Sequence, residues 1–395
     1  MSSALSGLKI LDLTMNLPGP YMTWILALLG ADVIKVENPS GGDYSRALMG
    51  DGNSSPFFEA VNRNKKSVAL NLKHPEGKRI FLTLLKTYDL LIDGFRPGTM
   101  ERLGLGYDDT SKVNSRLIHV SISGYGQTGP SRLTAGHDIN YLALSGILSM
   151  TGSRNRDLAL PGVQIADIAG GSLMALTGLL AAIIQREKTG KGQFVDVSMY
   201  DGLLSMATMV FAGVEAGLEP PEPARMTLNG RYPCYGAYKT LDGRYMSLGA
   251  LEFKFWKNFC LAVAREDLLN AQFGGPDVVT ELDRLFASRT QREWVEFMAP
   301  FDACCEPVLN LNEAVDSNLT QARSMVNSKP DGKRSLGFPL KLSESSVPPD
   351  NSAPGLGQHT TEVLKGIGIT EEELHSLASE GVIRYIPEIV NSTES

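Results

Sequence analysis

The stretch Leu8–Val36, LKILDLTMNLPGPYMTWILALLGADVIKV, decides the fold. Its ends, Leu8–Leu13 and Ala31–Val36, are short apolar runs of the kind that form buried strands. Between them, Tyr21–Leu29 is apolar and long enough to form a helix. Two neighbouring parallel strands need a long crossover connection, and a helix usually supplies it. The stretch therefore predicts a βαβ unit.

The alternation of strand and helix patterns continues through the first half of the chain. Pro75–Thr87 is expected to be a helix, because proline is favoured in a first helical turn. Buried strands are expected at Ser67–Leu72, Asp89–Phe95, Arg116–Ser123 and Gln193–Val197. Strands that alternate with helices build a parallel sheet covered on both faces. We therefore predict an α/β fold with a Rossmann-like large domain over residues 1–220.

A polar, proline-rich segment, Leu218–Pro223, ends this pattern and is typical of a stiff linker. After it, Tyr235–Thr240 and Arg244–Leu248 flank an Asp-Gly turn, which predicts a hairpin. Helices are expected from about Glu252, Asp277 and Thr290. We therefore predict a smaller α+β domain over residues 225–326.

The remaining residues, 327–395, are expected to pack on the large domain. Their first part, up to Pro354, is rich in serine, proline and aspartate and predicts an irregular return segment. Two short helices, Thr360–Lys365 and Glu371–Ser379, are expected to follow it.

Composition limits the class of protein. A chain of 395 residues is too long for one ordinary core, so two domains are expected. An apolar share of 43% and a charged share of 21% are typical of a soluble globular protein. The net charge of −7 argues against a nucleic-acid partner, although local basic groups can still bind a small anion.

Cysteine usage and hydropathy indicate a cytoplasmic protein. The four cysteines show no CxxC spacing, so reduced thiols are expected. Residues 1–20 lack a charged start followed by an apolar core, so no signal peptide is expected. The longest apolar run, Ile168–Ile184, contains glycines and is shorter than a comfortable membrane span. We expect it to be a buried helix, with no membrane partner.

A dinucleotide-binding motif is the first alternative to test. Gly124–Gly129 matches GxGxxG after a strand, but Pro130 follows it in place of the helix that the motif requires. Glu37 stands where a ribose-binding acid can sit, yet the turn after the first strand lacks the glycine pattern. Glu37 is therefore expected to be a strand-end charge, and a nicotinamide cofactor is not expected. No P-loop, HExxH or GxSxG motif is present, and no metal is expected.

Two polar clusters carry the candidate chemistry. His137 lies in Ala135–Tyr141, AGHDINY, and Asp167 opens the glycine-rich segment Ala166–Ser172, ADIAGGS. An imidazole and a carboxylate can together move a proton on and off carbon. The same aspartate can instead act as a covalent nucleophile. The residues alone leave both chemistries open.

Each candidate also has a purely structural interpretation. His137 can be a polar loop residue, Asp167 can be a helix N-cap, and Glu252 is ordinary in a first helical turn. Gly170-Gly171 costs a helix about 1 kcal/mol per glycine relative to alanine, which is tolerated where something approaches the backbone closely. The same helix start offers N–H groups to an oxyanion.

Six segments together resemble the class III CoA-transferase superfamily (CaiB/BaiF), and within it the α-methylacyl-CoA racemases. The segments are Leu5–Leu13, Gly30–Glu37, Arg96–Gly106, Gly124–Pro130, Thr189–Gln193 and Leu356–Thr360. By resemblance, transferases and racemases share the aspartate that matches Asp167, and transferases use it as a nucleophile. Racemases add the residues matched by His137 and Glu252, whereas transferases usually carry tyrosine at the former position.

The resemblance also implies an assembly and a substrate. The family forms homodimers of interlocked rings, which bring Glu252 of one subunit to His137 and Asp167 of the other. The substrate is an acyl-CoA, and no other cofactor is expected. Where some relatives have arginine, this chain has Asn38, with Arg46 as a speculative substitute for its phosphate contact. The expected CoA-binding set is Leu70, Asn71, Lys73, Arg96, Arg102, Gly136 and Tyr141.

The favoured hypothesis is racemisation of a 2-methylacyl-CoA by 1,1-proton transfer through an enolate. His137, oriented by Glu252, would serve one face of the α-carbon and Asp167 the other, with enolate donors at the Asp167–Gly170 backbone. The alternatives are CoA transfer through an Asp167 acyl adduct and a CoA-binding protein without catalysis. Asp138, next to His137, is expected to matter less. The sequence does not specify the acyl group.

Overall fold

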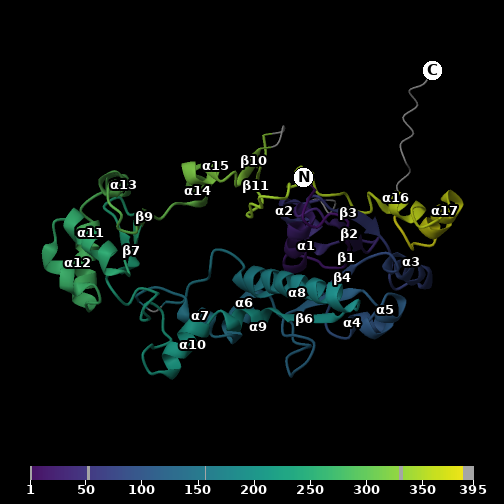
Figure 1. The fold of residues 1–395 in the computed structure, drawn as a ribbon, viewed down its shortest axis with the longest axis horizontal. Helices are drawn as coiled ribbons and strands as arrows, with labels where there is room; N and C mark the ends of the chain where they lie inside the picture. The colour runs from purple at the N-terminus through teal and green to yellow at the C-terminus, as the bar shows by residue number, and fades with distance from the viewer. Residues whose placement is uncertain (1, 51–53, 156, 329–331, 386–395) are drawn as a thin grey trace, which may run out of the picture. The chain divides into compact units, whose positions relative to one another are not determined.

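The computed structural model describes residues 2–50, 54–155, 157–328 and 332–385, and the chain divides into two compact units (Figure 1). The first unit is drawn from the ranges 1–145, 163–205 and 327–395. The second is drawn from 146–162 and 206–326. Each unit has its own sheet and its own hydrophobic core.

A six-stranded parallel sheet forms the centre of the first unit. Its strands are β1 (Lys9–Asp12), β2 (Asp32–Glu37), β3 (Lys66–Ala69), β4 (Leu90–Asp93), β5 (Ile118–Ser123) and β6 (Phe194–Ser198). The order is β3-β2-β1-β4-β5-β6, with every neighbouring pair parallel. The expected parallel α/β sheet is confirmed. The strand order reverses between β1 and β4, which is where open sheets of this kind form a binding crevice.

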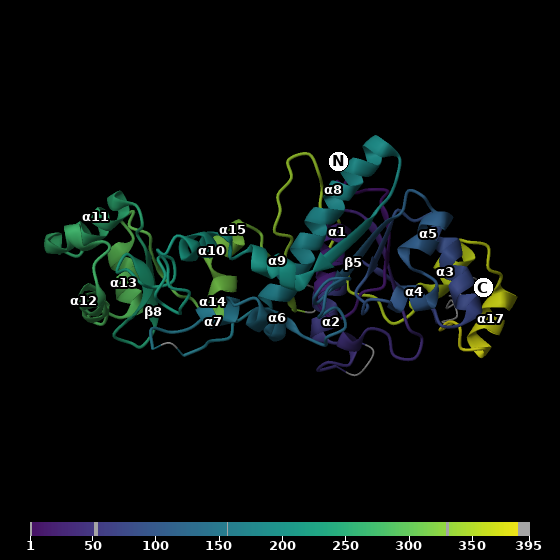
Figure 2. The same cartoon turned by 90° about the horizontal axis from the view of Figure 1, so that it is seen from below.

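Helices cover both faces of this sheet. Figure 2 shows α3 (Pro75–Leu85), α5 (Tyr107–Val113) and α17 (Glu371–Ser379) on one side, and α1 (Pro18–Leu28) and α8 (Met174–Thr189) on the other. The first unit also contains η1 (Tyr44–Arg46), α2 (Pro56–Asn62), α4 (Thr99–Leu103), α6 (Asp138–Leu144), the π-helix η2 (Ala166–Leu173), α9 (Met199–Ser205), α16 (Thr360–Lys365) and the short strand β11 (Arg334–Leu336). The short strand β10 (Val326–Ser328) begins at the last residue of the second unit and continues into the first.

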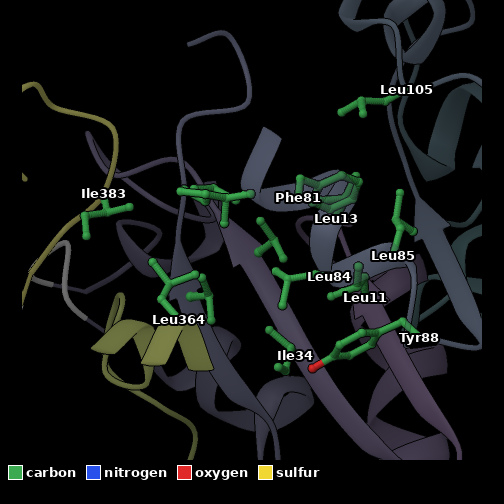
Figure 3. Packing of buried hydrophobic residues seen from close by; sticks show 14 of the residues in the cluster. Leu11, Leu13, Ile34, Phe81, Leu84, Leu85, Tyr88, Leu105, Leu364 and Ile383 are labelled. Atoms are coloured by element: carbon green, nitrogen blue, oxygen red, sulfur yellow. The ribbon is translucent and has the colours of Figure 1, made fainter. Parts of the chain in front are cut away.

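The C-terminal helices complete the core of the first unit. Leu364 of α16 and Ile383 lie among the buried side chains of the sheet and of α3, including Leu11 and Phe81 (Figure 3). The return segment is tied down nearby, because Arg63 Nη1 lies 2.6 Å from Asp350 Oδ2. Residues 332–385 therefore pack on the large unit.

The second unit is built on a three-stranded antiparallel sheet. Its strands are β7 (Tyr235–Lys239), β8 (Tyr245–Gly249) and β9 (Cys305–Pro307), and the first two form the expected hairpin. Aromatic side chains of Trp256, Phe259, Phe286 and Trp294 pack into one core against this sheet. Its helices are α7 (Ile147–Met150), α10 (Thr208–Glu215), α11 (Phe253–Ala262), η3 (Glu266–Ala271), α12 (Pro276–Phe286), α13 (Gln291–Met298), α14 (Leu311–Asp316) and α15 (Asn318–Ala322).

The division into units differs from the expected ranges 1–220 and 225–326. Residues 146–162 and 206–220 belong to the second unit. The physical reason is long-range contact, since Arg154 Nη1 lies 2.9 Å from Asp283 Oδ2 and its guanidinium lies 5.1 Å from the ring centre of Tyr238. Contacts between residues so far apart in sequence leave no local signal.

The apolar run Ile168–Ile184 is less buried than expected. It lies in a continuous helix, Ala166–Thr189, which by length and composition alone is apolar enough to span a membrane. Only 33% of its most apolar window is buried, and Leu180 and Ile184 are exposed. One face of the helix packs on β5 and β6, but the helix is apolar on more than one face. Apolar side chains on its other faces are therefore exposed to solvent.

Buried ion pairs stand beneath the carboxyl ends of β1 and β2. Lys35 is wholly buried, donates to the Thr14 carbonyl at 2.6 Å and lies 2.8 Å from Asp43 Oδ2. Lys65 Nζ lies 3.3 Å from Asp12 Oδ2, and both of these side chains are also wholly buried. Burial of a charge is costly unless it is paired and hydrogen-bonded, so these pairs constrain the loop that follows β1.

Glu37 belongs to the same buried region and confirms its expected role as a strand-end charge. Arg46 donates hydrogen bonds to both carboxylate oxygens of Glu37, at 2.7 and 2.8 Å, and the Ser67 hydroxyl donates to the same carboxylate at 2.6 Å. Arg46 is itself fully buried. Because the guanidinium of Arg46 is already bonded inside the protein, the hypothesis that it substitutes for the arginine of some relatives in contacting a CoA phosphate is wrong.

The GxGxxG segment is a turn, as expected. Gly126 has a φ of +82°, and the Gln127 N–H donates to the Asp196 carboxylate at 3.1–3.2 Å. The next helix, α6, begins only at Asp138. The Gln127 amide, which a dinucleotide-binding turn would offer to a pyrophosphate, is therefore already hydrogen-bonded to the Asp196 carboxylate.

The Lys35 pair yields a stability prediction. Replacement of Lys35 by methionine leaves Asp43 buried without its cation, and we expect the free energy of unfolding to fall by about 3–5 kcal/mol. Urea-induced unfolding followed by circular dichroism measures this loss.

The matched control is Lys66→Met, which breaks the partly exposed pair with Glu362 (38% and 60% exposed). An exposed pair contributes about 0–1 kcal/mol. Equal losses in the two variants would contradict the special role of the buried pair.

Candidate active site

A cavity of about 370 Å³ opens at the carboxyl ends of β1, β4 and β5 in the first unit. It contains both principal candidates, His137 and Asp167. The loops that follow the three strands contribute Thr14–Asn16, Gly94–Pro97 and Gly124-Tyr125. The cavity therefore lies where the strand order reverses, the expected place for a ligand in an open α/β sheet.

His137 is the exposed N-cap residue of α6. Its N–H donates to Asn140 Oδ1 at 3.0 Å, which fixes the start of the helix. Tyr141, buried beneath, donates its hydroxyl to the Gly136 carbonyl at 2.7 Å. Burial, with a smaller contribution from Asp167, raises the pKa of Tyr141, so its hydroxyl remains a proton donor. Tyr141 thereby holds the backbone that carries His137.

Asp167 lies in the first turn of the π-helix η2 and is half-buried. Burial first, and the neighbouring charge of Asp138 second, raise its pKa to about 7. Its N–H donates to Asp138 Oδ1 at 2.9 Å. Because the N-cap is Ile165, the alternative interpretation of Asp167 as an N-cap is wrong. π-Helical turns occur frequently at functional sites.

The two glycines after Asp167 serve helix packing. A Cβ at Gly170 would stand 2.6 Å from the Met199 carbonyl oxygen, and one at Gly202 would stand 2.2 Å from the Gly170 carbonyl oxygen. A Cβ at Gly171 would lie 2.9 Å from the Met199 side chain. The close approach that these glycines permit is therefore that of α9.

The expected enolate donors at the start of η2 are partly occupied. The Asp167 N–H is engaged by Asp138, and the Ile168 N–H donates to the Gln164 carbonyl at 3.0 Å. An amide that already donates inside the protein has no proton free for a substrate oxygen. The prediction that the Asp167–Gly170 backbone supplies these donors is therefore wrong for its first two amides.

The expected CoA-binding residues line a row of three neighbouring cavities. Arg96, Gly136 and Tyr141 belong to the cavity that contains Asp167. A second cavity of about 270 Å³ shares Thr14, Met15 and Phe95 with it and includes Leu70, Asn71 and Lys73. A third of about 400 Å³ shares Leu72, Lys73 and Leu103 with the second and includes Arg102.

Two residues near these cavities escaped the sequence analysis. Lys78 lines the third cavity together with Lys73 and Arg102. A lysine in the first turns of α3 faces the positive end of the helix dipole, and that unfavourable position was the available signal. Asp93 accepts the Phe95 N–H at 3.0 Å and lies 2.8 Å from His119 Nε2, so this buried pair fixes the loop that carries Arg96.

Glu252 is not among the residues that line the cavity of His137 and Asp167. It is the exposed N-cap residue of α11, in the second unit. That unit has a larger cavity of about 940 Å³ along β7–β9, which also does not include Glu252. The larger cavity holds none of the three predicted catalytic residues.

Known proteins resemble this chain over nearly its whole length. The family model for CoA-transferase family III matches residues 5–360. Human alpha-methylacyl-CoA racemase is 34% identical, covering 96% of this chain and 97% of the relative. Human succinyl-CoA:glutarate CoA-transferase is also 34% identical, covering 96% and 90%. A CAIB/BAIF family protein from Brucella suis has a TM-score of 0.80 at 26% identity, covering 93% of this chain and 100% of that structure. The chain belongs to CoA-transferase family III.

Proposed function

We propose that this protein is a 2-methylacyl-CoA racemase. The observation that carries the proposal is the shared cavity of His137 and Asp167, together with the elevated pKa of Asp167. Racemisation removes a proton from one face of the α-carbon and returns one to the other face. It therefore needs two groups that each exist with and without the proton near neutral pH.

Asp167 meets this requirement. With a pKa raised to about 7 by burial and by Asp138, it is largely neutral below that pH and largely ionised above it. Near neutrality the same carboxyl group can accept the α-proton of one epimer and donate a proton to the enolate formed from the other. His137 serves the opposite face, and the two roles exchange with the direction of the reaction.

The row of cavities supports an extended acyl-CoA as substrate. Lys73, Lys78 and Arg102 gather at the third cavity, where cationic groups can hold phosphates. The second cavity lies between this cluster and Asp167, through residues that it shares with both neighbours. The thioester end would then reach His137 and Asp167.

The enolate oxygen needs donors other than the first amides of η2. We assign this role to the amides of Asp138 and Ile139 and to the Arg96 side chain. Within the described residues neither amide donates a hydrogen bond, and both lie in the first turn of α6, which begins after His137. Arg96 lines the same cavity and is exposed. Donors placed in advance where negative charge develops make the largest contribution in many enzymes.

CoA transfer through an Asp167 adduct is the second candidate function. It is supported by the similarity to human succinyl-CoA:glutarate CoA-transferase, because the sequence identity to that transferase equals the identity to the human racemase. Incubation with a 2-methylacyl-CoA in deuterated water separates the two. Deuterium at the α-carbon with equilibration of the epimers supports racemisation. Formation of the acceptor's CoA thioester and the free 2-methyl acid, with a hydroxylamine-trappable Asp167 adduct and no α-exchange, would establish the transferase instead.

Replacement of His137 by alanine tests the acid–base assignment. We expect epimerisation to fall by about 10²–10⁴-fold, because the base of one face is removed. Exchange from the epimer whose proton Asp167 removes should decline less. Nuclear magnetic resonance of each pure epimer in deuterated water measures the two rates separately.

The control for this variant is His375→Ala, an exposed residue of α17 that lines none of the cavities described above. It should leave both exchange rates unchanged. Undiminished epimerisation in the His137 variant would exclude the imidazole from the reaction.

Lys78 yields a binding prediction. Lys78→Ala should raise the KM for acyl-CoA about tenfold with little change in kcat, because a phosphate contact worth about 1.4 kcal/mol acts on binding. A substrate without the 3′-phosphate shows whether this is the group contacted, since its KM should then be insensitive to the substitution. Lys86→Ala, at the other end of α3, is the matched control. An equal effect of both variants would indicate non-specific charge.

The proposal includes a homodimer in which Glu252 acts in the partner's site. Co-expression of His137→Ala with Glu252→Ala chains tests it, because a heterodimer with shared sites has one intact site. Random pairing makes half of the dimers mixed, so about one quarter of the wild-type activity should return. Activity no higher than that of either variant alone would place all three residues in a single chain.

A further inference from the structure

Asp138 joins the two segments that carry the candidate catalytic groups. It is the first residue of α6 and directly follows His137. Its Oδ1 accepts the N–H of Asp167 at 2.9 Å, across 29 residues of sequence. A single side chain thus connects the start of α6 with the start of η2.

We propose that Asp138 is a positioning residue that fixes Asp167 relative to His137 and keeps a second negative charge beside Asp167. This role rests on the proposed function, since it matters most for a group that must both accept and donate a proton. It replaces the expectation that Asp138 matters less than its neighbour.

The positional part follows from the hydrogen bond. An ionised carboxylate that accepts an amide proton forms a bond about twice as strong as a neutral pair. Here the amide belongs to Asp167 itself, so the bond locates the backbone from which the reactive carboxyl projects. A second set of hydrogen bonds holds the same backbone. The Ser172 hydroxyl lies 3.1 Å from the Asp167 carbonyl oxygen and 2.6 Å from the Pro18 carbonyl oxygen and donates to both.

The electrostatic part follows from the distribution of charge. Two neighbouring carboxylates resist simultaneous ionisation, and Asp138 thus adds to the effect of burial in raising the pKa of Asp167. The opposing cations in the cavity are Arg96 and Arg132, and both are exposed. Solvent weakens their influence on the half-buried carboxyl.

The other titratable groups around Asp167 come from every element packed on η2. His137, Tyr141 and Tyr125 line the same cavity, and α9 carries Tyr200 and Asp201. β5 carries His119, β6 carries Asp196, and α1 carries Tyr21. Towards its far end, α8 has Arg186, Glu187 and Lys188. Of all these groups, Asp138 is the one whose charge acts on the Asp167 pKa next after burial.

The substitution Asp138→Asn separates charge from geometry. The asparagine amide oxygen can still accept the Asp167 N–H, but the negative charge is gone. Titration of the Asp167 carboxyl carbon by ¹³C nuclear magnetic resonance, assigned with Asp167→Asn, reports its protonation in the full-length protein without substrate. We expect the midpoint to move down by about one pH unit.

The pH profile of α-exchange should shift in the same direction. For the epimer whose proton Asp167 removes, the rate rises as Asp167 ionises. A lower pKa therefore moves that acid limb to lower pH. A merely structural role of Asp138 would reduce the rate without moving the limb.

Three further variants complete the test. Asp138→Glu restores the charge and should restore the midpoint, whereas Asp138→Ala removes both charge and acceptor and should also lower kcat. Asp201→Asn removes a carboxylate from neighbouring α9 and should leave the midpoint unchanged.

An unmoved midpoint in the asparagine variant, or equal shifts in the asparagine and Asp201 variants, would overturn the inference. The titration needs no catalysis, so its outcome is distinct from that of the proposed function. A shifted midpoint without α-exchange in the wild-type protein would remove the racemase and retain the role of Asp138. If Asp138→Asn does not fold, Asp138→Ala takes its place, and an unmoved midpoint in that variant overturns the charge effect.

Discussion

The buried pairing of Lys35 with Asp43 is the constraint on which the site depends. Lys35 also donates to the Thr14 carbonyl, and Asp43 accepts the Asn16 N–H at 3.1 Å. Thr14–Asn16 lines the cavity that contains His137 and Asp167, and Thr14 and Met15 also line the cavity next to it. Charges without access to water tolerate few arrangements, because each displacement leaves a desolvated group unpaired. The buried pairing of Lys35 with Asp43 thereby fixes the shape of the loop Thr14–Asn16, which lines this cavity.

Burial raises the pKa of a carboxyl group, but neighbouring charges give Asp12 and Asp167 opposite net shifts. Burial alone would raise the pKa of Asp12, but Lys65 and Lys35 outweigh it and the pKa is lowered. At Asp167, which is half-buried, burial and the charge of the neighbouring carboxylate Asp138 both raise the pKa, to about 7. Asp12 thus remains a fixed anion that supports the fold, whereas Asp167 can exchange a proton near neutral pH. The sign of the neighbouring charge thus separates the carboxylate whose pKa is lowered from the one whose pKa is raised.

The sequence predicts what depends on local pattern, and it fails where long-range contact decides. The βαβ stretch Leu8–Val36, the hairpin and both C-terminal helices follow from periodicity and turn residues, and the structure has them. His137 and Asp167 were found because costly polar residues stand out in apolar surroundings, and they share one cavity. The contact of Asp138 with Asp167 was missed, since no pattern marks a hydrogen bond across 29 residues. The glycines of η2 indicate a close approach to the backbone, but the sequence does not show that α9 is the element that packs there.

Sequence identity does not separate the two chemistries of this family, because this chain is equally identical to a racemase and to a transferase. The environment of the shared aspartate is more discriminating. A nucleophilic carboxylate reacts as the anion and benefits from nearby positive charge, which Asp167 does not receive from its closest neighbour. A carboxyl group that must protonate an enolate needs the neutral form, and burial beside Asp138 supplies it. Under the racemase function proposed above, Asp138 would therefore contribute to the distinction along with His137.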